Sequence, residues 1–205
     1  MSSRDTTTNG VVIGRTSAGE GSVRAHLYTE TLGLVAAIAK SAREERSKLR
    51  AHLTTGTSGT FTLIKGEHGW RVTGAVKTHS SHFGLAHDSV AASSAGASKA
   101  KQEASARVIA VVRSLALGEG ANPELFHALW EFLVALPSLS SGDVCTAEQV
   151  AVVRILSALG YVAPEIDMPG LATCTYSPSA LAPLTPLSER LVATINKGLT
   201  ASGLV

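Results

Sequence analysis

Residues 19–43 read GEGSVRAHLYTETLGLVAAIAKSAR, and they hold the clearest indication of the fold in this chain. Its first half, residues 22–29, alternates between apolar and polar side chains, which is the pattern of a strand with one buried face. Residues 34–39 are almost continuously apolar and predict a more deeply buried strand. A turn at residues 30–33 joins the two strands, and a basic loop follows the second one. The pattern predicts a small β-barrel that exposes a cationic loop.

Three further segments supply the remaining strands of the predicted barrel. Residues 11–16 are rich in β-branched side chains, residues 52–64 are rich in Thr and broken by glycines, and residues 70–76 follow a hairpin turn. Glycines within a strand pattern are typical of bulges and bends, so residues 52–64 predict a bent strand. Five short strands with glycines at the bends match the five-stranded barrel of the oligonucleotide-binding (OB) fold. Residues 1–9 are polar and predict a frayed tail.

Beyond residue 87 the strand patterns end and apolar residues recur at helical spacing. Four helices are predicted, beginning at Ser98, at Asn122-Pro123, at a capping box from Thr146 to Gln149, and at Thr185-Pro186. The predicted fold class is therefore α+β with two domains. A five-stranded OB-fold barrel occupies residues 1–80, and an α-helical domain occupies residues 81–205.

The basic residues of this 205-residue chain are concentrated in its first part, although the net charge is only +2. Residues 1–80 hold eleven Lys and Arg against six Asp and Glu, whereas residues 81–205 hold seven against ten. Electrostatic binding to a polyanion is therefore expected in the N-terminal domain. The candidate contacts are cations of the basic loop and of the predicted strands, namely Lys40, Arg43, Arg46, Lys48, Arg50, Arg15, Arg24 and Arg71.

Several Lys and Arg on one loop can contact closely spaced phosphates together and release their counterions. The alternative is a solvated loop whose charge Glu44 and Glu45 half-cancel. Aromatic side chains that stack on bases are scarce in the barrel. Tyr28 lies on the polar face of its strand and is a candidate for stacking, while Phe61 and Trp70 are expected in the core. This composition favours contact with the nucleic-acid backbone over recognition of bases.

Catalytic and metal-binding motifs are scarce. The sequence has no phosphate-binding Gly-Lys-Ser/Thr loop, no Gly-x-Ser-x-Gly elbow and no paired-carboxylate motif, so we expect no enzyme and no cofactor. Cys145 and Cys174 are far apart, and His79, His82 and His87 are expected to form an exposed junction and no metal site. No apolar run reaches the roughly 20 residues of a membrane helix, and the polar N-terminus is no secretory signal. We therefore expect a cytoplasmic protein with no membrane contact.

Four segments, in the same order along the chain, resemble the bacterial recombination mediator family RecO. They are residues 19–33 (the family's first hairpin), residues 39–50 (its basic loop), residues 122–126 (a helix start in the second domain) and residues 154–161 (the helix that precedes its zinc region). Several members carry four cysteines after this last helix. Here residues 164–177 hold only Cys174, so zinc is not expected.

The resemblance implies an OB-fold that binds single- and double-stranded DNA, anneals complementary strands and works with RecR. It also implies help in loading RecA onto strands covered by single-stranded DNA-binding protein (SSB), and a helical domain that docks the acidic C-terminal tail of SSB. Candidates for pairing with that tail's carboxylate are Arg107, Arg113 and Arg154. The alternative is that each Arg only snorkels at the edge of the core. Two other functions stay open, an OB-fold module that binds RNA or acts in translation, and a scaffold that uses the helical domain alone.

Overall fold

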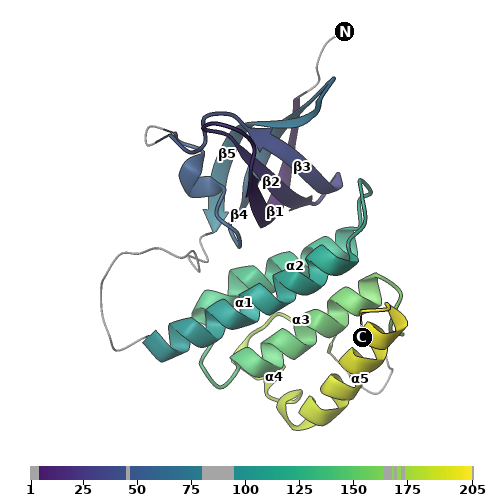
Figure 1. Ribbon diagram of the computed structural model, residues 1–205. Coiled ribbons are helices and arrows are strands. Elements are labelled where there is room, and N and C mark those ends of the chain that lie inside the picture. The colour runs from purple at the N-terminus through teal and green to yellow at the C-terminus, as the bar shows by residue number, and fades with distance from the viewer. Residues whose placement is uncertain are drawn as a thin grey trace. The chain divides into compact units, whose positions relative to one another are not determined.

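The N-terminal part of the chain forms a closed five-stranded barrel in the computed structural model (Figure 1). The structure describes residues 5–44, 47–79, 95–163, 168, 170–171 and 174–204. The strands are β1 (Asp5–Ser17), β2 (Val23–Thr29), β3 (Gly33–Ala39), β4 (Ser58–Gly66) and β5 (Gly69–His79). They follow the order β1-β2-β3-β5-β4, and every neighbouring pair is antiparallel except β3 with β5. The predicted OB-type barrel followed by helices is confirmed.

Strand β1 is longer than the sequence pattern indicated, because it pairs with two neighbours. Its first half pairs with β4 from Asp5 onward, and its second half pairs with β2 up to Ser17. A bulge between Val12 and Gly14 interrupts the register with β2. The frayed tail predicted for residues 1–9 was therefore wrong from Asp5 onward, because these polar residues hydrogen-bond to β4 through their backbone.

Strand β4 begins at Ser58 and not at residue 52. Residues 50–52 form the short 3-10 helix η1 (Arg50–His52), and a turn follows in which Gly56 has a φ of +85°. The N–H of Gly56 donates to the C=O of Val12 at 2.8 Å, and the N–H of Val12 donates to the C=O of Thr57 at 2.9 Å. Gly56 therefore supplies the positive φ of a turn whose backbone hydrogen-bonds to β1. The irregularity expected in this strand is present, because its register with β5 shifts between Ser58 and Gly59 and again between Thr62 and Leu63.

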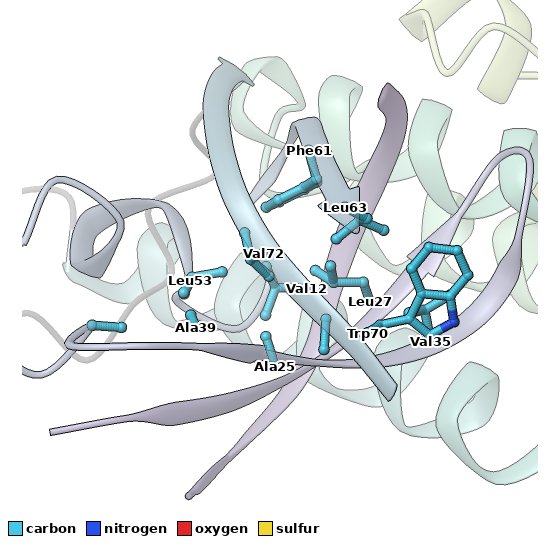
Figure 2. Packing of buried hydrophobic residues seen from close by; sticks show 12 residues of the cluster. Val12, Ala25, Leu27, Val35, Ala39, Leu53, Phe61, Leu63, Trp70 and Val72 are labelled. Carbon is cyan, nitrogen blue, oxygen red and sulfur yellow. The ribbon is translucent and has the colours of Figure 1, made fainter. Parts of the chain in front are cut away.

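The barrel core combines a few large side chains with several alanines, as Figure 2 shows. Phe61, Leu63 and Leu27 are no more than 1% exposed, and Trp70 is 9% exposed. Burying one such large apolar side chain stabilises the fold by roughly 1.5–3 kcal/mol. Small side chains fill the rest of the narrow interior, at Ala25, Ala37, Ala39 and Ala42. The core positions predicted for Phe61 and Trp70 are confirmed.

The second part of the chain is helical. Its elements are α1 (Ala95–Leu115), α2 (Pro123–Ala135), η2 (Leu136–Ser138), α3 (Val144–Ala158), α4 (Pro178–Leu181), η3 (Thr185–Leu187) and α5 (Ser188–Ala201). Helix α3 packs against both α1 and α5. At Gly198 of α5, an added Cβ would lie only 2.8 Å from Cδ1 of Leu156 on α3. The missing side chain thus lets these two helices approach closely.

Two predicted helix starts have different outcomes. Asn122 caps α2 as expected, because its Oδ1 accepts a hydrogen bond from the N–H of Leu125 at 3.0 Å. The capping box from Thr146 to Gln149 was wrong, since α3 begins two residues earlier at Val144. Thr146 is buried within the first turn, and its hydroxyl oxygen lies 3.4 Å from that of Thr185.

The chain divides into two compact units, Met1–Gly84 with Ala116–Phe126, and Leu85–Leu115 with His127–Val205. Ala116–Phe126, here called the docked segment, therefore groups with the barrel. The N–H of Leu34 donates to the C=O of Gly118 at 3.3 Å, and the N–H of Gly120 donates to the C=O of Leu32 at 3.1 Å. The domain boundary predicted at residue 80 falls outside the described residues and stays a prediction.

Candidate nucleic-acid interface

One end of the barrel opens into a pocket of about 470 Å³, here called the mouth pocket. Its apolar floor is formed by Val23, Ala42 and Leu53, and the last two belong to the buried core of the barrel. Three exposed arginines line it as well, Arg15, Arg43 and Arg50, together with Thr16 and Ser17. The pocket therefore combines an apolar surface with three positive charges.

Local backbone structure fixes these arginines. Ser41 adopts a φ of +53°, which turns the chain after β3 and lets the N–H of Arg43 donate to the C=O of Gly21 at 2.9 Å. The side chain of Arg43 then reaches β1, where its Nη1 donates to Oγ of Ser17 at 3.0 Å. Arg50 stands at the start of η1, three residues before Leu53 enters the core.

A second set of cations lies on the outer wall of the barrel and is here called the wall cluster, consisting of Arg24, Lys40 and Arg71. Arg24 on β2 is opposite Ile38 on β3, and Ile38 is opposite Arg71 on β5. Directly opposed residues share one face of a sheet, so the two arginines flank Ile38 on the same face. Lys40 follows Ile38 by two positions and therefore continues that face, one residue beyond β3. All three cations are exposed.

The charges of both sets are available to a ligand. Among the described residues, none of these six cations forms an ion pair, and Lys65 is the one basic residue of the barrel that does. Glu44 follows Arg43 and lies beside the turn at Gly21, yet it forms no ion pair within the described part of the chain either. Exposed cations without carboxylate partners are what a phosphate backbone requires.

The predicted basic loop is only partly described. Lys40, Arg43, Lys48 and Arg50 are exposed, whereas Arg46 lies outside the described residues. The structure brings Arg43 and Arg50 together with Arg15 around the mouth pocket, and it places Lys40 with Arg24 and Arg71 on the wall. Six of the seven described candidates thus fall into these two sets. Lys48 belongs to neither set.

No aromatic side chain of the barrel is available for stacking on a base. Residues 1–80 hold three such side chains, and Tyr28, Phe61 and Trp70 are 3%, 1% and 9% exposed. The stacking role considered for Tyr28 was wrong, because the residue is buried although it follows the polar face of β2. Burial also raises the pKa of its phenol to about 12. The arrangement favours contacts with phosphates.

Sequence reasoning missed a carboxylate that comes from the docked segment. Oε2 of Glu119 lies 2.9 Å from Nζ of Lys65, and its Oε1 accepts a hydrogen bond from the indole Nε1 of Trp70 at 2.9 Å. These two hydrogen bonds lower the pKa of Glu119. Nothing in the sequence could have revealed this contact, because the partners are about 50 residues apart and no short motif joins them.

The arginines proposed for partner binding lie in the helical unit, and two of them already bind carboxylates. Arg107 on α1 forms two hydrogen bonds to Glu148 on α3, through Nε and Nη2. Arg154 on α3 is 2.8 Å from Glu131, and its guanidinium stands over the ring of Tyr176 at 5.7 Å. Arg113, in the last turn of α1, is exposed and forms no ion pair with a described residue.

The described ranges contain no group of three or more His, Cys, Asp and Glu placed to hold a metal ion. Cys145 is exposed and Cys174 is buried. His82 and His87 lie outside the described residues, and only the backbone of His79 is described. None of the described helices is both long and apolar enough to span a bilayer.

Comparison with known proteins finds a family match for the barrel. None of the curated proteins matches the chain. Residues 1–80, which contain all five strands, match the family model described as "Recombination protein O N terminal". The match covers the hairpin and the basic loop whose residues resemble RecO, so that resemblance is confirmed over the barrel. Residues 1–80 of this chain are thus similar to the N-terminal domain of the RecO family.

Proposed function

We propose that the chain is a RecO-type recombination and repair protein whose barrel binds single- and double-stranded DNA and anneals complementary strands. The observation that carries the proposal is the contrast between its two groups of arginines. Those of the mouth pocket and the wall cluster have no carboxylate partner among the described residues, whereas Arg107 and Arg154 do. Free cations at a barrel of this family favour a polyanionic ligand.

Annealing requires no covalent chemistry. Two DNA strands repel each other through their phosphates, and a cationic surface screens that repulsion so that complementary bases can meet. The buried aromatic side chains of the barrel agree with this mechanism, because contact with phosphates tolerates any sequence. We therefore propose a binding protein without catalytic residues or cofactors, which cooperates with RecR and supports the loading of RecA.

Salt dependence of DNA binding tests this proposal. The Arg43→Ala/Arg50→Ala variant should bind unrelated DNA sequences more weakly and lower the slope of log affinity against log salt by up to about 1.5 units. The charge-matched control is Arg113→Ala/Lys197→Ala, which removes two exposed cations from the helical unit. An unchanged salt slope in the folded Arg43→Ala/Arg50→Ala variant would contradict the proposal. In a separate competition experiment, RNA of the same sequence tests whether the barrel prefers DNA.

For the helical unit we propose docking of the SSB tail, and the ion pairs of its three candidate arginines support an order among them. A terminal carboxylate would have to displace Glu148 from Arg107 or Glu131 from Arg154. Arg113 needs no such displacement, because no described carboxylate pairs with it. We therefore expect Arg113 to be the contact with the peptide, with Arg107 and Arg154 serving mainly to join helices.

A further inference from the structure

Arg15 of the mouth pocket and Arg24 of the wall cluster lie on opposite faces of the same sheet. Arg15 is opposite Ala25, which is fully buried, whereas its neighbour Thr16 is opposite the exposed Arg24. Successive residues of a strand point to opposite faces, so Arg15 belongs to the inward face where β1 runs beyond the core. Arg24 belongs to the outward face. A ligand strand that follows the outward face at Arg24 therefore does not run along the inward face at Arg15.

The two sites also differ in shape and chemistry. The mouth pocket is concave, has an apolar floor, and its volume of about 470 Å³ is within the ordinary range for small-molecule sites. A single nucleotide suits a site of this kind, with its base over Val23, which is only partly buried, and its phosphate on the arginines. Arginine guanidinium groups also stack on flat rings, which provides the base with a second contact. The wall cluster presents cations on strands around Ile38 and supports backbone contact only.

A base can enter such a pocket only when it is unstacked. Single strands release a base at low cost, whereas a duplex must first break a base pair and its stacking. The wall cluster makes no such demand, since single and double strands both present phosphates on their outside. The pocket thus selects single strands, and the wall accepts either form.

We infer that one barrel holds two nucleic-acid strands at once, an unstacked nucleotide of a single strand in the mouth pocket and the backbone of a second strand on the wall cluster. This inference rests on the proposed function, because it assigns the two parts of that DNA-binding surface. It explains how a single chain could bring two strands together for annealing, since residues of both sites belong to the same sheet.

Two charge-matched variants separate the sites. Arg15→Ala/Arg50→Ala removes two cations from the pocket, and Arg24→Ala/Arg71→Ala removes two from the wall; all four side chains are exposed, so both variants should fold. Each should be compared for binding of a poly-dT oligonucleotide and of a blunt duplex. The pocket variant should lose about tenfold in affinity for poly-dT and much less for duplex, and the wall variant should lose more for duplex.

Simultaneous occupancy has its own readout. Donor- and acceptor-labelled poly-dT strands cannot pair with each other, so energy transfer between them on one chain reports two bound strands. The full chain should show such transfer under conditions where sedimentation finds one chain per complex, and either variant should lose it. Absence of transfer with saturated poly-dT, or equal losses for both ligands in both variants, would overturn the two-strand inference. Failure of the proposed function is distinguishable, because the unaltered chain would then bind neither DNA at low salt.

Discussion

Replacing Gly33 by Ala should detach the docked segment from the barrel. Gly33 has a φ of +70°, and a Cβ there would lie 2.1 Å from the carbonyl oxygen of Gly120. A positive φ costs an ordinary residue about 1–2 kcal/mol. The clash also breaks the hydrogen bonds that join Leu34 to Gly118 and Gly120 to Leu32, each contributing about 0.5–1.5 kcal/mol. The expected loss of stability is therefore about 2–5 kcal/mol.

Gly19→Ala is the matched control for this substitution. Gly19 has a φ of +80° but nothing lies within 4 Å of its added Cβ, so only the backbone strain of about 1–2 kcal/mol applies. Urea unfolding gives the free energies, and amide hydrogen exchange locates the effect. In Gly33→Ala the N–H groups of Leu34 and Gly120 should exchange much faster, while those paired between β1 and β4 should not.

Two results would refute this reasoning. One is equal destabilisation by Gly33→Ala and Gly19→Ala, since the contact with Gly120 would then contribute nothing. The other is unchanged protection of the Gly120 amide in Gly33→Ala, which would show that the segment tolerates a methyl group at this position.

Four other predictions follow from the described contacts. Hydrogen bonds with Lys65 and Trp70 lower the pKa of Glu119, so the contact with Trp70 is at full strength above pH 4.5, the ordinary carboxyl pKa, and is lost as the pH falls through the lowered pKa. The indole fluorescence should change over that acidic range, and Glu119→Gln should lose this transition. Arg154→Ala should destabilise the helical unit by about 1–3 kcal/mol in thermal melts, because the Arg154 side chain is only 12% exposed and contacts Glu131 and Tyr176. Arg107→Ala should cost less than about 1 kcal/mol, because the Arg107 side chain is 57% exposed. Arg113→Glu should abolish binding of an SSB-tail peptide in calorimetry of the full chain and leave DNA binding intact; an unaffected peptide affinity would contradict docking there. Elemental analysis should find no stoichiometric zinc, and a chelator should leave the melting temperature unchanged; one tightly bound zinc per chain would contradict this.

The sequence predicted the strands whose two faces meet different environments. Residues 22–29 alternate because β2 has the core on one side, and β2 begins within one residue of the expected position. The first residues of β1 carry no such alternation, since Thr6, Thr7 and Thr8 are polar and are held by backbone pairing with β4. A strand stabilised mainly by its backbone leaves little trace in side-chain hydropathy.

Side-chain exposure was harder to predict than strand position. Tyr28 follows the polar side of β2 and yet is buried, so alternation alone did not determine its environment. Arg15 and Arg24 looked equivalent in the sequence, and only the register with Ala25 and Thr16 separates them. The mouth pocket escaped prediction for the same reason, because it forms where residues from β1, β2 and the loop before β4 converge.

The parallel pairing of β3 with β5 has a consequence for how the barrel closes. These two strands pair only at Ala37 with Trp70 and at Ile38 with Arg71, whereas every other neighbouring pair of strands forms a ladder of seven or more paired positions. The β3–β5 ladder that closes the barrel is thus the shortest of the five, and it joins residues about 33 positions apart in the chain. Transient opening of the barrel should therefore begin at this β3–β5 seam. Arg24 and Arg71 stand on either side of that seam. If the proposed function holds, a DNA strand bound across these two arginines would stabilise the closed barrel, because a ligand that binds only the closed form lowers the population of the open form.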